Sequence, residues 1–180
     1  ADTLADADGL GPTTYQWQRD GTLIDGATGE THTLTQDDVG AEITVAASYT
    51  DDGGTAESVA SEATEAVANV NDAPTGAVTI AGTATEGETL TAADTLADAD
   101  GLGTIAYQWQ RDGTPIDGAT GTTHTLTRDD VGAEITVAAS YTDGGGTLES
   151  VVSDPTGPVE GVNEPPALAL VNASQTLSEG

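Results

Sequence analysis

Apolar and polar residues alternate along several short stretches of the chain. One such stretch predicts a β-strand that buries one face, and its apolar positions are Ile135, Val137, Ala139 and Tyr141. Residues 107–110 alternate in the same way and run into an Asp-Gly step at 112–113, which favours a tight hairpin turn. No segment keeps a helical period for more than a turn or two. The pattern predicts an all-β fold of short strands joined by turns.

The same patterns occur twice in the chain. The string ADTLADADGLG begins at Ala1 and again at Ala93, and His32 recurs as His124, which gives a spacing of 92 residues. Solenoid repeats usually have roughly 20 to 50 residues and cannot fold alone, whereas a unit of about 90 residues can close its own core. We therefore expect domains in tandem.

Two proline-containing segments indicate the domain boundaries, because proline ends strand pairing. They are NVNDAP at residues 69–74 and VNEPP at residues 162–166. We predict a domain lacking its first strand at residues 1–72 and a complete domain at 73–164, whose first strand covers about residues 77–80. Residues 165–180 are predicted to be the first strand of a following domain.

Composition narrows the functional classes. The 180 residues include 31 acidic and three basic side chains, for a formal net charge of −28, and there is no cysteine. Such a chain repels nucleic acid and anionic membrane surfaces and attracts cations. No window resembles a transmembrane span or a signal peptide. Because no disulfide can restrain the fold, a metal ion could do so in a chain rich in aspartate.

Several motifs carry a family resemblance. Trp17 and Trp109 occupy the place of the core tryptophan of an immunoglobulin-type sandwich. Over nearly the whole chain, YQWQRDG, DGATG, HTLT, DDVG and NVNDAP resemble the Ig-like or cadherin-like repeats of giant RTX-type bacterial surface adhesins. This resemblance implies tandem Ig-like Greek-key sandwiches at the bacterial cell surface, with neighbouring repeats of the same array as partners.

The candidate functional residues are aspartates in loops, which could bind a metal ion. In an Ig-like sandwich the loops at residues 96–101 and 141–144 lie at the end of the domain where the preceding linker arrives. Oxygen donors from the loops and the linker should therefore converge there. Ca²⁺ is coordinated by six to eight such oxygens. Paired Asp loops and this linker resemble cadherin junctions, which calcium makes rigid. The predicted ligands are Asn71, Asp72, Asp98, Asp100 and Asp143, with Asp6, Asp8 and Asp51 in the first repeat.

A plain structural role for these loops stays open, because Asp and Gly are ordinary turn formers. The two repeats also differ, since Asp52 in the first is replaced by Gly144 in the second. Asp38 and Asp130 are expected to cap the corner before the long strand, and Asp112 to serve its hairpin. The six aromatic residues are assigned to the core. His32 and His124 are expected to be structural.

The chain contains no nucleophile elbow, phosphate loop or zinc pattern, so we expect no enzyme. The favoured function is an extender repeat of an extracellular adhesin or surface fibre. The alternative is a ligand-binding module for polysaccharide or a protein partner, which predicts an exposed aromatic residue or a groove. Residues 167–170, Ala-Leu-Ala-Leu, are expected to pair with the open edge of the first domain of a second copy, giving head-to-tail self-association.

Overall fold

The computed structural model describes residues 4–165 of the chain. Within this range every regular element is a β-strand or a short 3-10 turn, which confirms the predicted all-β class. The chain divides into two compact units. The first consists of Ala1–Ala73, Asp98–Gly101 and Asp143–Thr147, and the second of Pro74–Ala97, Leu102–Thr142 and Leu148–Gly180. No helix among residues 4–165 is long and apolar enough to span a membrane.

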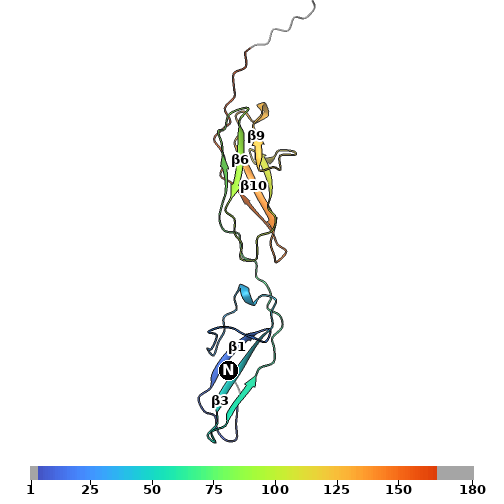
Figure 1. The fold of residues 1–180 in the computed structure, drawn as a ribbon. Helices are drawn as coiled ribbons and strands as arrows, with labels where there is room; N and C mark the ends of the chain where they lie inside the picture. The colour runs from blue at the N-terminus through green and yellow to red at the C-terminus, as the bar shows by residue number, and fades with distance from the viewer. Residues whose placement is uncertain (1–3, 166–180) are drawn as a thin grey trace, which may run out of the picture. The chain divides into compact units, whose positions relative to one another are not determined.

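The second unit is a sandwich of two antiparallel sheets (Figure 1). One sheet has the order β5-β6-β9, with the strands Val78–Ala81, Thr89–Asp94 and Thr123–Thr125. The other has the order β11-β10-β7-β8, with the strands Leu148–Val152, Ile135–Thr142, Ala106–Arg111 and Thr114–Pro115. The chain crosses between the sheets after β6, after β8 and after β9. This connectivity is that of an immunoglobulin-like sandwich, as predicted.

The core of the second unit lies between its two sheets. Val137 stands opposite Trp109 in the β10–β7 ladder, and both side chains are completely buried. Leu90 of β6 and Leu126, which follows β9, cover them from the other sheet. The alternating residues of β10 therefore face the core, as their spacing predicts.

The first unit contains one four-stranded antiparallel sheet with the order β2-β1-β3-β4 (Figure 1). Its strands are Thr22–Leu23, Thr14–Arg19, Ile43–Thr50 and Ala56–Ala60. Their register matches that of the second unit, since Trp17 stands opposite Val45 as Trp109 stands opposite Val137. The tandem repeat of the sequence is thus a repeat of this sheet.

The two units differ in how the apolar face of this sheet is covered. Leu34 is 53% exposed, whereas its equivalent Leu126 is 2% exposed. Trp17 and Tyr49 are half-buried, unlike their buried counterparts Trp109 and Tyr141, which departs from the expected core position. The physical reason is that no described residue of the first unit supplies strands equivalent to β5 and β6. Tyr15 and its counterpart Tyr107 are half-buried in both units. Residues 166–180, including the predicted strand at 167–170, lie outside the described range.

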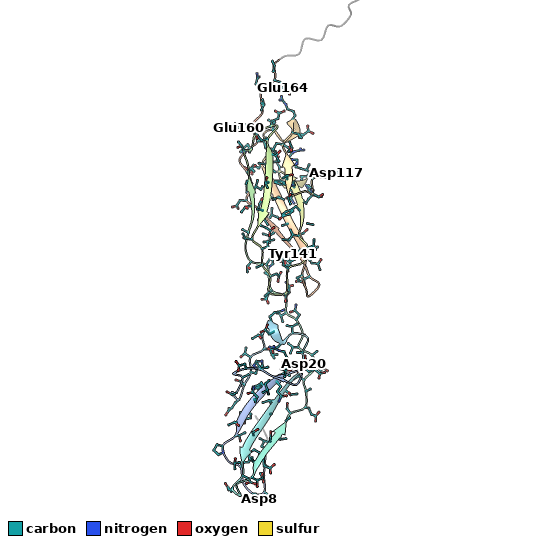
Figure 2. The ribbon with its side chains drawn as sticks, viewed as in Figure 1. Asp8, Asp20, Asp117, Tyr141, Glu160 and Glu164 are labelled. Carbon is teal, nitrogen blue, oxygen red and sulfur yellow. The ribbon has the colours of Figure 1, made fainter. Side chains whose placement is uncertain are left out.

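Local turn chemistry follows the sequence closely. Asp20, labelled in Figure 2, and Asp112 have positive φ angles of 47° and 48°, and each is followed by a glycine with positive φ, as a two-residue hairpin turn requires. A 3-10 turn precedes each long strand, at Gln36–Asp38 (η1) and Arg128–Asp130 (η2). Each turn has a capping box, which confirms that Asp38 and Asp130 cap these corners.

Candidate metal site

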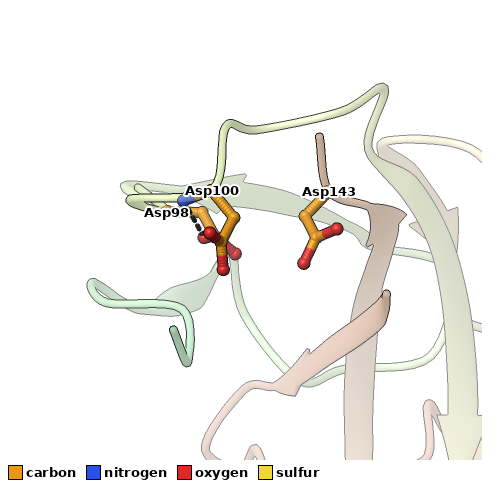
Figure 3. A group of neighbouring side chains, drawn as sticks. All are labelled: Asp98, Asp100 and Asp143. Atoms are coloured by element: carbon orange, nitrogen blue, oxygen red, sulfur yellow. Dashed lines mark hydrogen bonds between the residues drawn. The ribbon is translucent and has the colours of Figure 1, made fainter. Parts of the chain in front are cut away.

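Three aspartates from two loops lie together. Asp98 and Asp100 belong to the loop after β6, and Asp143 begins the turn between β10 and β11. One carboxylate oxygen from each lies within 4.8 Å of the others. Figure 3 shows the three carboxylates directed towards a common space from their two loops. Asp100 and Asp143 are buried, and Asp98 is half-buried.

Backbone hydrogen bonds fix the shape of both loops. The backbone N–H of Asp100 donates to Oδ1 of Asp98 at 2.9 Å, and that of Thr147 donates to Oδ1 of Asp143 at 2.7 Å. The N–H of Gly144 donates to the carbonyl oxygen of Asp100 at 3.0 Å and so joins one loop to the other. A side chain at Gly144 would collide with that carbonyl oxygen. Glycine at this position therefore permits the close approach of the loops.

One oxygen of the cluster has no hydrogen-bond partner. Oδ2 of Asp143 is buried and accepts no hydrogen bond from any described residue, and the residue as a whole is only 6% exposed. A buried carboxylate oxygen without a donor loses its hydration and gains nothing in return. Because two further carboxylates lie beside it, their mutual repulsion adds to this cost. A cation among the three would remove both penalties.

The segment before the second unit contributes to the surroundings of Asp100. The backbone N–H of Asp72 donates to Oδ2 of Asp100 at 2.6 Å, and Nε2 of Gln36 donates to Oδ1 at 2.8 Å. Gln36 also donates to Oδ1 of Asn69 at 3.3 Å. The predicted ligand Asp72 thus reaches the cluster through its backbone N–H, while its side chain is exposed. Asn71 is the neighbouring residue in the same exposed segment.

The equivalent residues of the first repeat are arranged differently. Asp6 accepts from the N–H of Asp8 at 2.9 Å, and Asp51 accepts from the N–H of Thr55 at 2.7 Å, so the local loop shapes are retained. However, Asp6, Asp8 and Asp51 do not form a group of neighbouring carboxylates among the described residues. Asp8 is exposed, and the Tyr49 hydroxyl donates to Oδ2 of Asp6 at 2.9 Å.

That hydrogen bond from Tyr49 has an electrostatic consequence. The bond to the Asp6 carboxylate, together with burial, raises the pKa of Tyr49. The Asp6 carboxylate is thereby engaged by a neutral donor. The sequence predicted ligands in both repeats, and among residues 4–165 only Asp98, Asp100 and Asp143 form a group of neighbouring carboxylates.

Gln36 and Asn69 were not among the predicted site residues. Gln36 lies 64 residues from Asp100 in the chain, and its counterpart in the second repeat is Arg128. No local pattern links a glutamine in a corner turn to a loop of the next repeat. The replacement of Gln36 by Arg128 between two nearly identical repeats was the one available signal.

A second buried polar cluster occurs in each repeat and involves the capping aspartate. The Arg19 guanidinium donates to Oδ1 of Asp38 at 2.8 Å, and Oδ2 accepts from the Thr35 backbone N–H at 2.9 Å. Nε2 of His32 lies 3.1 Å from the same Oδ2. Burial raises the pKa of Asp38, but the hydrogen bonds from Thr35, Arg19 and His32 outweigh it and lower the pKa to about 2.

The second repeat has the same arrangement. Arg111 donates to Oδ1 of Asp130 at 2.7 Å, and the Thr127 N–H donates to Oδ2 at 2.8 Å. Burial raises the pKa of Asp130, but the hydrogen bonds from Thr127 and Arg111 outweigh this effect, so the net shift of its pKa is downward. Because these carboxylates have their own donors, both clusters are suited to holding the corner and leave no oxygen free for a metal.

His124 is the only histidine of the second unit. It lies at 11% side-chain exposure with Nε2 3.4 Å from Oδ2 of Asp130, and its ring packs against Trp109 with a centroid separation of 5.7 Å. His32 packs against Trp17 in the same way, also at 5.7 Å. Both histidines thus belong to the aromatic packing beside the capping aspartates.

No family model matches the sequence, and no curated protein matches it. Among solved structures, the tandem Ig repeats of Dlar are similar to this chain, with 15% identity over 84% of each chain and a TM-score of 0.31. Because that score is low, the Ig-like assignment rests on the strand connectivity of the second unit.

Proposed function

We propose that this chain is a structural extender repeat of an extracellular bacterial adhesin or surface fibre, and that Asp98, Asp100 and Asp143 bind calcium. The observation that carries the metal proposal is the buried Oδ2 of Asp143, which lacks a donor and faces two other carboxylates. The sequence repeat and the resemblance to adhesin arrays support the structural role. The role is one of structure and binding, without catalysis.

Calcium suits this cluster better than the other common cations. Carboxylates are hard oxygen ligands, and the described residues contain no cysteine or histidine near the three aspartates that would favour zinc. Mg²⁺ demands near-ideal octahedral geometry, whereas Ca²⁺ accepts the irregular set that two loops provide. An extracellular module facing millimolar calcium needs only a dissociation constant of about 10⁻⁴ to 10⁻³ M.

Binding would restrain the segment that leads into the second unit. Asp100 holds the backbone N–H of Asp72 and the side chain of Gln36, so an ion on Asp100 also orders these groups. Carbonyl and amide oxygens of this segment, including those of Asn69 and Asn71, could complete the coordination. In a spacer repeat, a cation that stiffens the chain at this point would help to resist extension.

The test is isothermal titration of calcium into the 180-residue chain after treatment with a chelator. We expect binding at submillimolar to millimolar concentration for the wild type and at least tenfold weaker binding for Asp143→Asn, which keeps the side-chain shape but removes the charge. Asp51→Asn is the matched control, because Asp51 makes the same bond to its loop but has no carboxylate cluster. A parallel titration with Mg²⁺ should give weaker binding.

Two results would contradict the proposal. The first is the absence of any calcium heat at millimolar concentration in the wild-type chain. The second is an equal loss of affinity in Asp51→Asn and Asp143→Asn, since this would mean that calcium binds through overall negative charge. Hydrogen exchange of residues 69–73 provides an independent readout, because bound calcium should slow it.

A further inference from the structure

The aspartate cluster receives hydrogen bonds from the protein but no positive charge. Nε2 of Gln36 and the backbone N–H of Asp72 donate to the two oxygens of Asp100, at 2.8 and 2.6 Å. The chain has only three basic residues, and each is paired elsewhere: Arg19 with Asp38, Arg111 with Asp130 and Arg128 with Glu86. The charge of the three clustered carboxylates is therefore not compensated by any basic side chain of the protein.

Gln36 is held in place by the corner that precedes the long strand β3. It is the first residue of η1, and the capping aspartate of this turn, Asp38, is completely buried. The N–H of Gly40, which follows the turn, donates to the carbonyl oxygen of Val67 at 2.8 Å and fixes the corner to the segment that leaves the sheet. The amide of Gln36 is thus presented to Asp100 from a hydrogen-bonded turn, which reduces the entropy cost of the contact.

Gln36 also reaches the surroundings of Asp143. Its Nε2 donates to Oδ1 of Asn69 at 3.3 Å. The Asn69 amide packs against the turn that begins at Asp143, since a Cβ added at Gly145 would stand only 2.6 Å from Nδ2 of Asn69 and 3.4 Å from Oδ1 of Asp143. One glutamine side chain therefore contacts both the Asp100 carboxylate and the amide beside Asp143. All of these residues belong to the first compact unit.

The second repeat shows what a charged residue does at the same position of the turn. Arg128 begins η2 as Gln36 begins η1, and Nη1 of Arg128 donates to Oε2 of Glu86 at 3.4 Å. The same oxygen of Glu86 accepts from the backbone N–H of Val162 at 3.0 Å. In both repeats, an acid thus accepts from the first residue of the turn and from a backbone N–H of the segment that follows the sandwich. Only the arginine also supplies a positive charge.

We propose that residue 36 determines whether the aspartate cluster is neutralised by a metal ion or by the protein, and that glutamine keeps the cluster dependent on a divalent cation. This inference rests on the proposed calcium site. Glutamine donates to one oxygen of Asp100 and orients it without adding charge. The three carboxylates then attract a dication undiminished, because Coulomb attraction scales with their summed charge. An arginine at this position would compete with the ion for Asp100.

The test compares Gln36→Arg and Gln36→Glu in the full 180-residue chain, by melting in a chelator and by calorimetric calcium titration. Glutamate has the shape of glutamine but replaces the N–H donor with a fourth carboxylate, whereas arginine supplies its own cation. In the chelator, Gln36→Arg should raise the melting temperature by about 4 °C, the shift expected of one ion pair in a domain of this size. Gln36→Glu should lower the melting temperature, because it adds to the repulsion.

Calcium titration should give the opposite order of the variants. Gln36→Arg should weaken calcium binding roughly tenfold and Gln36→Glu should strengthen it by a similar factor, since calcium affinity depends on the number of charged ligands. Opposite signs distinguish an electrostatic role from a structural one, because the loss of a merely structural hydrogen bond would weaken binding in both variants. Asp37→Asn is the matched control, since it changes the net charge by the same amount at the neighbouring exposed residue. It should alter the affinity less than about threefold in physiological salt.

Three results would overturn this inference. Equal calcium affinity in the wild type and in Gln36→Arg would refute the role of residue 36 and leave the calcium site intact. Affinity shifts of the same sign in Gln36→Arg and Gln36→Glu would reduce the residue to a structural contact. An effect of Asp37→Asn as large as that of Gln36→Arg would assign the change to overall charge. Absence of calcium heat in the wild type is a distinct outcome, because it refutes the proposed calcium site and this inference together.

Discussion

Replacing Leu126 and Leu34 separately by alanine tests how differently the two units are packed. Both leucines lie in the sequence His-Thr-Leu-Thr, but Leu126 is 2% exposed and Leu34 is 53% exposed. Removing a fully buried leucine costs about 2–5 kcal/mol of unfolding free energy, through lost burial and the cavity left behind. Full burial of a leucine is worth about 1.5–3 kcal/mol, so the half-covered Leu34 should cost about 1 kcal/mol or less.

Native-state hydrogen exchange in increasing urea measures the free energy of unfolding for each unit in the intact chain. Fragments of the long strands can be assigned because Asp52 in one repeat is replaced by Gly144 in the other. We expect Leu126→Ala to lower the stability of the second unit at least twice as much as Leu34→Ala lowers that of the first. Equal losses would refute the reasoning, because they would mean that Leu34 is covered in solution.

Three further predictions concern titration and the buried aspartates. Asp38 and Asp130 both have a lowered pKa when folded, so the stabilisation that each provides is complete above about pH 4 and is lost as the pH falls, towards pH 2 in the case of Asp38. Urea unfolding between pH 7 and pH 2.5 should show this loss, and Asp38→Asn should reduce it in the first unit. Asp130→Asn should destabilise the second unit by about 2 kcal/mol at pH 7, because Arg111 loses a charged acceptor; a melting temperature unchanged from wild type would contradict this. The hydrogen bond to Asp94 raises the pKa of Tyr107 to about 12. The stability that this bond contributes is therefore present below about pH 10 and is lost as the pH rises through 12. In ultraviolet titration, Asp94→Asn should lower the pKa of that tyrosine.

Features set by nearest neighbours along the chain were predictable. The Asp-Gly hairpins need two consecutive positive φ angles, and the capping aspartates need only a threonine three residues earlier. Strand faces follow from a period of two, which placed Val137 and Tyr141 inside. These elements depend on short-range sterics and hydrogen bonds, so both repeats show them alike.

Features set by contacts between distant segments were not predictable. Asp6, Asp8 and Asp51 have the same sequence context as the second-repeat set, yet only the latter forms a carboxylate cluster. The difference accompanies Gln36 and the N–H of Asp72, which bond to Asp100 but are far from it in the sequence. The loops indicated candidate aspartates in both repeats, but they did not indicate in which repeat the carboxylates lie together.

The sequence His-Thr-Leu-Thr occurs in both units. Comparing its two copies distinguishes the effect of local strand propensity from the effect of pairing with another strand. In the second unit Thr123–Thr125 is the strand β9, paired with β6, whereas residues 31–33 form no strand although the sequence there is almost the same. Because propensity is nearly equal in the two cases, the pairing with β6 must account for the difference. Residues 31–34 thus lack the strand partner that β6 provides in the second unit, although their threonines and leucine have the same strand propensity as those of residues 123–126.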